Sequence, residues 1–196
     1  QTNGKTNGEV YKVKPGNSKY VDVNKDGVYN DADQGIIGCG QPTFNWGWNN
    51  TFNYKNFDFS FFVVGFHGFD IYNATHQMGY NLIKSQQMAG VTPMRELLNR
   101  WTPTNTNTDI PGFVKGGTEN KDFFSTRFVE NGSFIKMKSI TLGYTLPEAT
   151  CRSLGINNLR VYASVQNPFH ITKYSGLDPE ATMGSPLVQG VDWGAY

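Results

Sequence analysis

The strongest constraint on the fold is a stretch of alternating aromatic and polar residues between positions 44 and 66. Over residues 44–54, aromatic side chains occupy nearly every even position, and small or polar side chains occupy the odd ones. Over residues 57–63, the odd positions are apolar. An alternation of period two over about ten residues is typical of a β-strand. The sequence therefore predicts two strands joined by a two-residue turn at Lys55-Asn56.

This turn also sets the register of the predicted hairpin. Asn tolerates the positive φ that a tight hairpin turn requires. A two-residue turn places apolar residues opposite one another, in the pairs Tyr54 with Phe57, Phe52 with Phe59, and Trp48 with Val63. Turn and hydrophobic pattern therefore agree on one register.

The pattern leaves two environments open for the apolar face. It is either the core of a soluble β domain or the lipid-facing side of an outer-membrane barrel, since each arm is long enough to cross a bilayer as a tilted strand. In the barrel, the opposite face would line a wet lumen with Asn45, Asn49, Thr51, Asn53, Asp58 and Ser60. No apolar run approaches the length of a membrane helix, so a membrane protein of this sequence must be a barrel.

Composition favours strands and turns and excludes several function classes. The 196 residues are 14% aromatic and include 22 glycines. The formal charge of +1 favours no charged partner, and no basic patch indicates nucleic acid. The two cysteines, Cys39 and Cys151, make no disulfide framework. We expect them to lie at opposite ends of the strands, too far apart for a bridge.

Residues 22–33 match the spacing of a calcium-binding loop. Oxygen-bearing residues stand at loop positions 1, 3, 5, 9 and 12, a backbone carbonyl at position 7, and Gly27 at the sharp turn. The predicted ligands are Asp22, Asn24, Asp26, Val28 through its carbonyl, Asn30 and Asp33. The alternative is a loop whose Asp and Asn side chains hydrogen-bond their own backbone.

Residues 67–132 form a long connection with few strand signals. Thr92 is a good N-cap, and Pro93 suits the first helical position. Apolar residues then follow at helical spacing, namely Met94, Leu97, Leu98 and Trp101. The pattern predicts one short amphipathic helix within this connection.

Two further strands are predicted at 133–145 and 158–168, joined by a compact turn at 147–157. In the first of them, Lys136 and Lys138 fall on the same face as the apolar residues at 140, 142 and 144. We therefore expect that end of the strand to project beyond the hydrocarbon. The second strand alternates cleanly, with polar residues such as Arg160 and Gln166 on one face.

Catalytic signals are weak. His67, His76 and His170 are scattered singly, and no nucleophile elbow, zinc-protease helix or phosphate-binding loop occurs. Asp178 and Glu180 flank Pro179 and are predicted to shape a turn. The chain is predicted not to be an enzyme.

The order of several motifs resembles the C-terminal end of SusC/RagA-type TonB-linked outer-membrane proteins. The resemblance extends from about Gly8 to Tyr196 and rests on the Asp22–Asp33 loop, the Tyr54-Lys55-Asn56-Phe57-Asp58 turn, Gly132-Ser133-Phe134-Ile135-Lys136, Leu142-Gly143-Tyr144-Thr145-Leu146-Pro147, Arg160-Val161-Tyr162, Gln166-Asn167 and Tyr174-Ser175-Gly176-Leu177-Asp178-Pro179-Glu180. It implies an all-β fold, an antiparallel meander of long strands that forms part of a transmembrane β-barrel. It also implies import of oligosaccharides or peptides across the outer membrane of a Gram-negative bacterium.

The resemblance further implies partners and a domain plan. The partners are a SusD-type surface lipoprotein, the TonB–ExbB–ExbD complex acting through parts of the protein absent from this sequence, and outer-membrane lipid. The chain then corresponds to a C-terminal barrel fragment without plug or closing strand, and its edge strands should each lack one neighbour. Its parts are an extracellular segment with the calcium-like loop (1–43), a hairpin (44–66), an extracellular loop carrying the short helix (67–132), a second hairpin (133–168) and a last extracellular loop (169–196).

Loop lengths independently support the assignment of segments to the extracellular or the periplasmic side, because outer-membrane barrels have short periplasmic turns and long extracellular loops. The short connections at 55–56 and 147–157 are assigned to the periplasmic side on this ground. The competing hypothesis is a secreted β-rich binding module with a dockerin-like, calcium-dependent loop.

Overall fold

The computed structural model describes residues 4–6, 9–11, 15–18, 20–27, 31–80, 94–112, 125–180 and 189–194. The chain divides into two compact units, and each is described by itself. Unit 1 comprises residues 1–38, 72–129 and 192–196, and unit 2 comprises residues 39–71 and 130–191.

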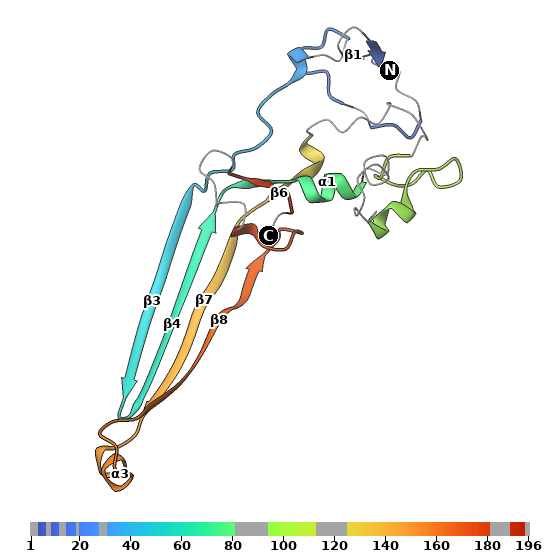
Figure 1. Cartoon of the computed structure of the whole chain (residues 1–196). Coiled ribbons are helices and arrows are strands. Elements are labelled where there is room, and N and C mark those ends of the chain that lie inside the picture. The colour runs from blue at the N-terminus through green and yellow to red at the C-terminus, as the bar shows by residue number, and fades with distance from the viewer. Residues whose placement is uncertain are drawn as a thin grey trace. The chain divides into compact units, whose positions relative to one another are not determined.

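A four-stranded antiparallel sheet dominates unit 2 (Figure 1). Its strands are β3 (Phe44–Tyr54), β4 (Phe57–His67), β7 (Phe134–Thr145) and β8 (Arg160–Thr172), in the spatial order β3-β4-β7-β8. Each strand pairs with its neighbour in this order, so the predicted meander is confirmed. Among the residues that the structure describes, β3 and β8 each have one unpaired edge, as predicted.

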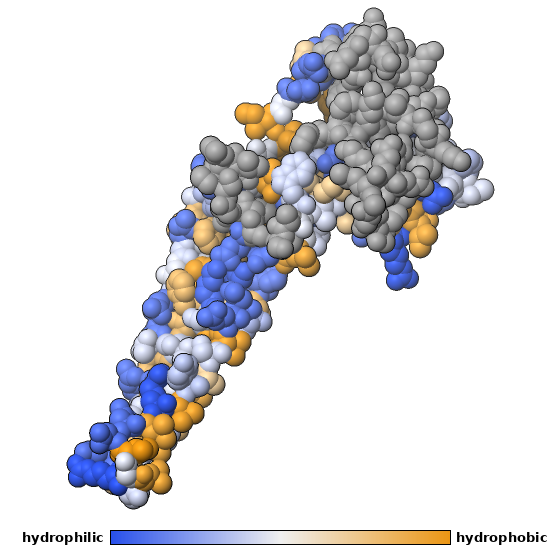
Figure 2. All heavy atoms as spheres, viewed as in Figure 1, coloured by the Kyte–Doolittle hydropathy of each residue, from blue (hydrophilic) through white to orange (hydrophobic). Residues whose placement is uncertain are grey.

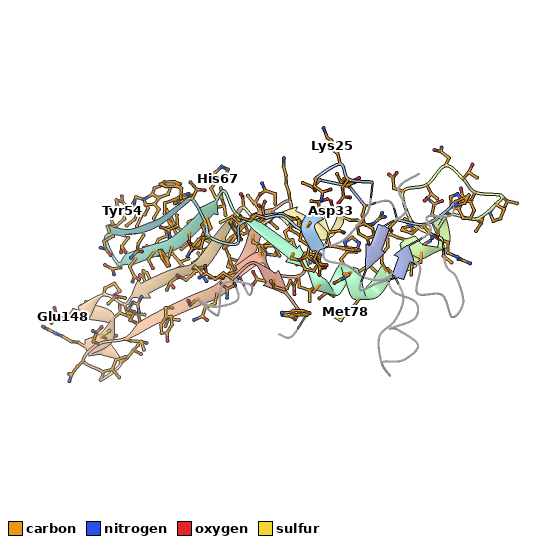
Figure 3. All side chains as sticks on the ribbon, turned by 90° about the horizontal axis from the view of Figure 1, so that it is seen from above. Lys25, Asp33, Tyr54, His67, Met78 and Glu148 are labelled. Carbon is orange, nitrogen blue, oxygen red and sulfur yellow. The ribbon has the colours of Figure 1, made fainter. Side chains whose placement is uncertain are left out.

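The β3–β4 hairpin has the predicted register, with Tyr54 opposite Phe57, Phe52 opposite Phe59, and Trp48 opposite Val63. The turn chemistry differs from the prediction in one respect. The positive φ, 52°, belongs to Lys55, whereas the prediction assigned it to Asn56. In Figure 3, Tyr54 marks the turn end of the hairpin and His67 the opposite end.

The connection between β7 and β8 is compact and contains the short helix α3 (Glu148–Ser153). Pro147 precedes the helix and fixes its entry, and Cys151 is buried within it. Cys39, in contrast, is exposed, and its backbone carbonyl accepts a hydrogen bond from the Asp70 amide at 2.7 Å. Both cysteines are free in the structure.

A bulge at Lys138 corrects the predicted faces of β7. Ser139 pairs with Phe62, but Met137 pairs with Val63, so Lys138 is an extra residue. An extra residue reverses the alternation of the strand beyond it. Lys136 therefore lies on the polar face of the sheet with Val64, and the prediction that it shares the face of Ile140 was wrong.

The last strand extends four residues beyond the predicted end at 168. Opposite Lys138, strand β8 contributes two residues, Asn167 and Pro168, and Asn167 has a φ of 48°. Proline has no N–H to donate to a ladder, and within sheets it is tolerated at bulges and edges. Because Pro168 falls in the bulge, pairing resumes at Phe169 and continues to Thr172.

The buried core of unit 2 lies at the end of the sheet away from the turns. It consists of Val64, Phe69, Ile71, Phe134 and Tyr174, with Phe66 packed against it. Phe66 and Phe134 stack with ring centroids 5.1 Å apart. A β-carbon on Gly132 would collide with Phe69, so only glycine fits beside this core.

The remaining elements are short. They are β1 (Gly4–Thr6) paired with β2 (Glu9–Tyr11), the 3₁₀ turn η1 (Asp31–Asp33), β5 (Asp70–Asn73), α1 (Ala74–Tyr80), the 3₁₀ turns η2 (Arg95–Asn99) and η3 (Thr126–Phe128), β6 (Val129–Asn131) and β9 (Val191–Asp192). Strands β6, β5 and β9 form a second small sheet in that order. None of the helices in the described part of the chain has the length and hydrophobicity needed to span a membrane.

The helix predicted near residue 94 is replaced by η2, a five-residue 3₁₀ turn. Thr92 and Pro93, the predicted cap and first residue, lie outside the described residues. Leu97 is buried, but Leu98 is exposed. In a 3₁₀ turn, residues three apart share a face and residues four apart do not, so the predicted apolar stripe does not form.

Candidate functional site

One face of the four-stranded sheet is apolar and exposed along most of its length. Its side chains make aromatic contacts across strands, such as Trp48 with Phe61 at 5.1 Å and Phe57 with Tyr144 at 4.6 Å between centroids. Large apolar residues of the sheet that remain exposed include Trp46, Trp48, Phe52, Tyr54, Phe57, Leu142, Val161 and Val165. Figure 2 shows hydrophobic residues at the surface along the sheet. A contiguous exposed apolar surface of this kind marks contact with a membrane or a protein.

Aromatic packing fills the gaps that small residues leave on this face. Trp46 pairs with Gly65 across the hairpin, and a β-carbon on Gly65 would collide with the indole. Phe52 stacks on Phe59 at 6.3 Å. The face is therefore continuous, and many of its large side chains remain exposed among the residues that the structure describes.

The opposite face is polar near the turns. Arg160 donates two hydrogen bonds to Asp58, at 3.0 and 2.6 Å, and this ion pair spans from β8 to β4 over the intervening β7. Gly143 lies beneath the pair, and a β-carbon there would collide with both side chains. Thr141 and Ser164 share a hydrogen bond of 2.9 Å on the neighbouring strands. These groups suit contact with water.

All six residues predicted to line a wet lumen share this face of the sheet. Asn53 pairs with Asp58 and Thr51 with Ser60. The predicted set also contains Asn45 and Asn49, which pair with Phe66 and Phe62. The alternation continues through these positions, but the face becomes apolar toward the end of the sheet away from the turns.

A cavity of about 570 Å³ opens at the turn end of the sheet. It lies between the β3–β4 turn and the α3 connection, and polar residues such as Asn53, Asp58 and Asn158 contribute to its lining. It extends the hydrophilic character of the polar face to the end of the strands.

The calcium-like loop has ordered side-chain to backbone contacts. Asp33 is buried and accepts from the Val23 amide at 2.8 Å, while Asp22 Oδ2 accepts from the Gly27 amide at 2.8 Å. Asn24 Oδ1 accepts from the Asp26 amide at 3.0 Å. The side chain of Lys25 points away from the loop (Figure 3).

Within the described ranges, no group of three His, Cys, Asp or Glu side chains could hold a metal ion. Two of the predicted ligands, Val28 and Asn30, lie outside those ranges. Asp22 Oδ1 is buried, and no hydrogen-bond partner for it occurs in the described part of the chain. The calcium site therefore stays a prediction.

Unit 1 contains a polar and aromatic cluster that the sequence did not reveal. Tyr80 donates a 2.6 Å hydrogen bond to Glu96, and the His76 ring lies 3.4 Å from the same carboxylate. Burial, followed by the carboxylate, raises the pKa of Tyr80 to about 12, and the hydrogen bond from Tyr80 lowers the pKa of Glu96. The guanidinium of Arg127 lies over the Tyr80 ring. The partners are 16 to 20 residues apart, and no spacing rule joins them.

The histidines and the acidic pair are also placed. His67 ends β4, His76 lies in α1, and His170 lies in β8 rather than in a loop. The Glu180 amide donates to Asp178 Oδ1 at 3.0 Å, so the predicted turn at Asp178 and Glu180 is present. The same two carboxylates also accept hydrogen bonds from Lys136, which the sequence did not indicate.

The chain is similar to several TonB-dependent receptors. It is 35% identical over 188 residues to TonB-dependent receptor P3 of Formosa agariphila, and 32% identical over 173 residues to TonB-dependent receptor SusC of Bacteroides thetaiotaomicron. The matches cover 93% and 87% of this chain, but only 18% and 16% of the two relatives. The chain thus spans less than a fifth of the length of these relatives. No family model matches the sequence.

Solved structures give the same result for the fold. A structure of the RagAB peptide transporter matches with a TM-score of 0.63 and 26% identity, covering 78% of this chain and 15% of the other. The RagAB peptide importer in its closed-closed state matches with a TM-score of 0.62 and 25% identity. These relatives are transport proteins and receptors, which agrees with the prediction that the chain is not an enzyme.

The comparisons also explain the two unlike faces of the sheet, since strands of an outer-membrane barrel present apolar residues to lipid and polar residues to the lumen. The motifs, the strand order and these similarities place the chain in the family of SusC/RagA-type TonB-dependent receptors, which are outer-membrane proteins.

Proposed function

We propose that this chain forms part of the barrel wall of a transporter that imports oligosaccharides or peptides across the outer membrane of a Gram-negative bacterium. The observation that carries the proposal is the unequal sheet, with an exposed apolar face on one side and the Asp58–Arg160 face on the other. The outer edges of β3 and β8, which have no paired strand among the described residues, support it, because a strand edge in lipid needs a neighbour.

Partners belong to the same proposal. One is a SusD-type surface lipoprotein, supported by the similarity to SusC and to the RagAB peptide transporter. The other is the TonB–ExbB–ExbD complex, which would act through parts of the receptor outside this chain. The competing secreted binding module is disfavoured, since relatives of 31–35% identity over 92–93% of this chain are TonB-dependent receptors.

The substrate class can be tested in cells that carry the full-length receptor. We expect deletion of the receptor to abolish uptake of one class of labelled probe, either mixed oligopeptides or mixed oligosaccharides. Uptake should also stop when the proton gradient is dissipated. Unchanged uptake of both classes after deletion would overturn the proposal, and a soluble, secreted location of the receptor would favour the binding module.

Calcium binding by residues 22–33 is a second proposal. It is supported by the ligand spacing and by the buried Asp22 Oδ1, for which no partner occurs among the described residues. Carboxylate, amide and carbonyl oxygens suit calcium better than zinc. We expect the full-length receptor to bind calcium, and Asp22→Asn to weaken the binding, in a calorimetric titration. An unchanged titration curve in Asp22→Asn would contradict this assignment.

A further inference from the structure

Residues 173–180, here called the strap, cover the polar face of the sheet at the end away from the turns. Tyr174 is only 5% exposed and belongs to the core that contains Val64 and Phe134. Pro179 is among the most deeply buried residues. Val64 lies on the same face as Asp58, because even positions of β4 share that face, and Phe134 of β7 pairs with Phe66 of this set. The strap therefore lies on the side predicted to face the lumen.

Two lysines of β7 bind the carboxylates of the strap. Lys136 is 6% exposed, and its Nζ donates to Asp178 at 2.6 Å and to Glu180 at 2.8 Å. Lys138 donates to the other oxygen of Glu180. Two positive and two negative groups thus compensate each other in a partly buried site, where an unpaired charge would be costly.

A second set of contacts holds the beginning of the strap. Glu130 accepts from the Ser175 amide at 2.8 Å and from its hydroxyl at 2.7 Å. The Tyr174 amide donates to Thr172 Oγ1 at 3.1 Å, which in turn donates to the Ser133 carbonyl at 3.0 Å. The strap is therefore fixed at both ends.

The bulge at Lys138 makes this arrangement possible. In a regular strand, Lys136 and the apolar residues at 140, 142 and 144 would share one face. The extra residue moves Lys136 to the polar face, where both lysines reach Glu180. Bulges commonly re-aim a side chain in this way.

We propose that the strap is a fixed lip of the lumen at the extracellular mouth, held by Lys136 and Lys138, and that it contacts the incoming solute. This inference rests on the proposed function. Asp178 and Glu180 of the strap neutralise both lysines. An incoming solute would therefore meet the strap rather than two unpaired cations. Leu177 lies in the middle of the strap and is 76% exposed, so its side chain is available for this contact.

The hold on the strap can be measured by hydrogen exchange on the full-length receptor. We expect Lys136→Met to raise the exchange rate of the strap amides by about tenfold or more, since local opening becomes easier. The matched control is Arg160→Met, which removes a cation at the other end of the sheet and should leave the strap unchanged. Glu130→Gln, a milder variant, should accelerate exchange mainly near Ser175. Unchanged strap exchange in both Lys136→Met and Glu130→Gln would overturn the proposal.

The position of the strap can be measured by thiol labelling of Leu177→Cys in intact cells, in a receptor without other cysteines. We expect a small membrane-impermeant maleimide to react and a large polyethylene glycol maleimide to react much more slowly, because the mouth restricts access. A control cysteine at the exposed Leu98 tests that both reagents reach the receptor. Equal labelling of Leu177→Cys by both reagents would overturn the placement in the lumen. If the receptor imports nothing, the proposed function fails, while these two measurements still decide the strap.

Discussion

The two ends of the polar face differ in what covers them. Near the turns, Asp58 and Arg160 form an ion pair that is accessible to solvent, and Thr141 and Ser164 bond to each other on the same face. At the other end, Phe134 is 3% exposed beneath the strap. One face of one sheet therefore contains both a wet wall and a small protein core.

This difference shows what strand alternation does and does not specify. Alternation decides which side chains share a face, because the period of a strand is two. It does not decide whether that face contacts water, lipid or another segment of the chain.

The largest effect is expected from Phe134→Ala in the covered core. Removing a buried phenylalanine typically costs ~3–5 kcal/mol, because a cavity remains. We expect the chemical unfolding midpoint of the full-length receptor in detergent to fall. The matched control is Phe57→Ala near the turns, where the ring is 52% exposed and solvent or lipid fills the space. Equal losses in the two variants would show that the covered core packs no more tightly than the exposed apolar face.

The next largest effect is expected from Phe61→Arg on the apolar face. An arginine facing lipid near the middle of a barrel strand costs ~2–4 kcal/mol. We expect poorer folding into lipid vesicles, measured as the fraction of heat-modifiable folded protein on a gel. Ser60→Arg, one residue away on the polar face, should fold nearly as well as the unmodified receptor. If Phe61→Arg folded better than Ser60→Arg, the lipid-facing and lumen-facing sides of the sheet would be the reverse of our assignment.

A smaller effect on stability is expected when the pH is lowered and the carboxylates of the strap become protonated. Burial would raise the pKa of Asp178 and of Glu180, but hydrogen bonds from Lys136, joined by Lys138 at Glu180, outweigh it and hold each pKa below its ordinary value. The unfolded chain then binds protons at higher pH than the folded chain does. The stabilisation is therefore complete above about pH 5 and is lost as the pH falls through the lowered pKa values.

This pH dependence is checked with thermal unfolding of the receptor and of an Asp178→Asn, Glu180→Gln double variant. At pH 7, the melting temperature of the unmodified receptor should be higher than that of the double variant. The difference between the two melting temperatures should shrink below about pH 4. A difference that stays constant across this range would show that the carboxylates do not stabilise the strap through their charge.

The smallest effect is expected from Asp58→Asn near the turns. The Asp58–Arg160 pair is accessible to solvent, and exposed ion pairs are weakened by salt and contribute little to stability. We expect an unfolding midpoint within the error of the unmodified receptor at physiological salt. A large loss would show that the wet end of the polar face is covered by another part of the full-length receptor.

The hairpin and the meander could be predicted because their determinants are local. The two-residue turn and the alternation of period two determine the pairs of the hairpin, from Tyr54–Phe57 to Trp48–Val63. The alternation of short and long connections indicates the meander. The predicted helix near residue 94 failed because its first residues and its apolar stripe do not determine whether a turn is α or 3₁₀. The contact of Tyr80 with Glu96 could not be predicted, because no local rule joins residues 16 apart outside one helix.

The sequence by itself determined the strands, their order and the membership of most side chains in one face or the other. Only the tertiary structure decided the side of Lys136, since one extra residue at Lys138 reverses the face and leaves no signature in the composition. It also decided that Asp178 and Glu180 meet that lysine from 42 and 44 residues away. The physical reason is that alternation is a property of neighbouring residues, whereas burial and charge pairing depend on which distant segment packs against them.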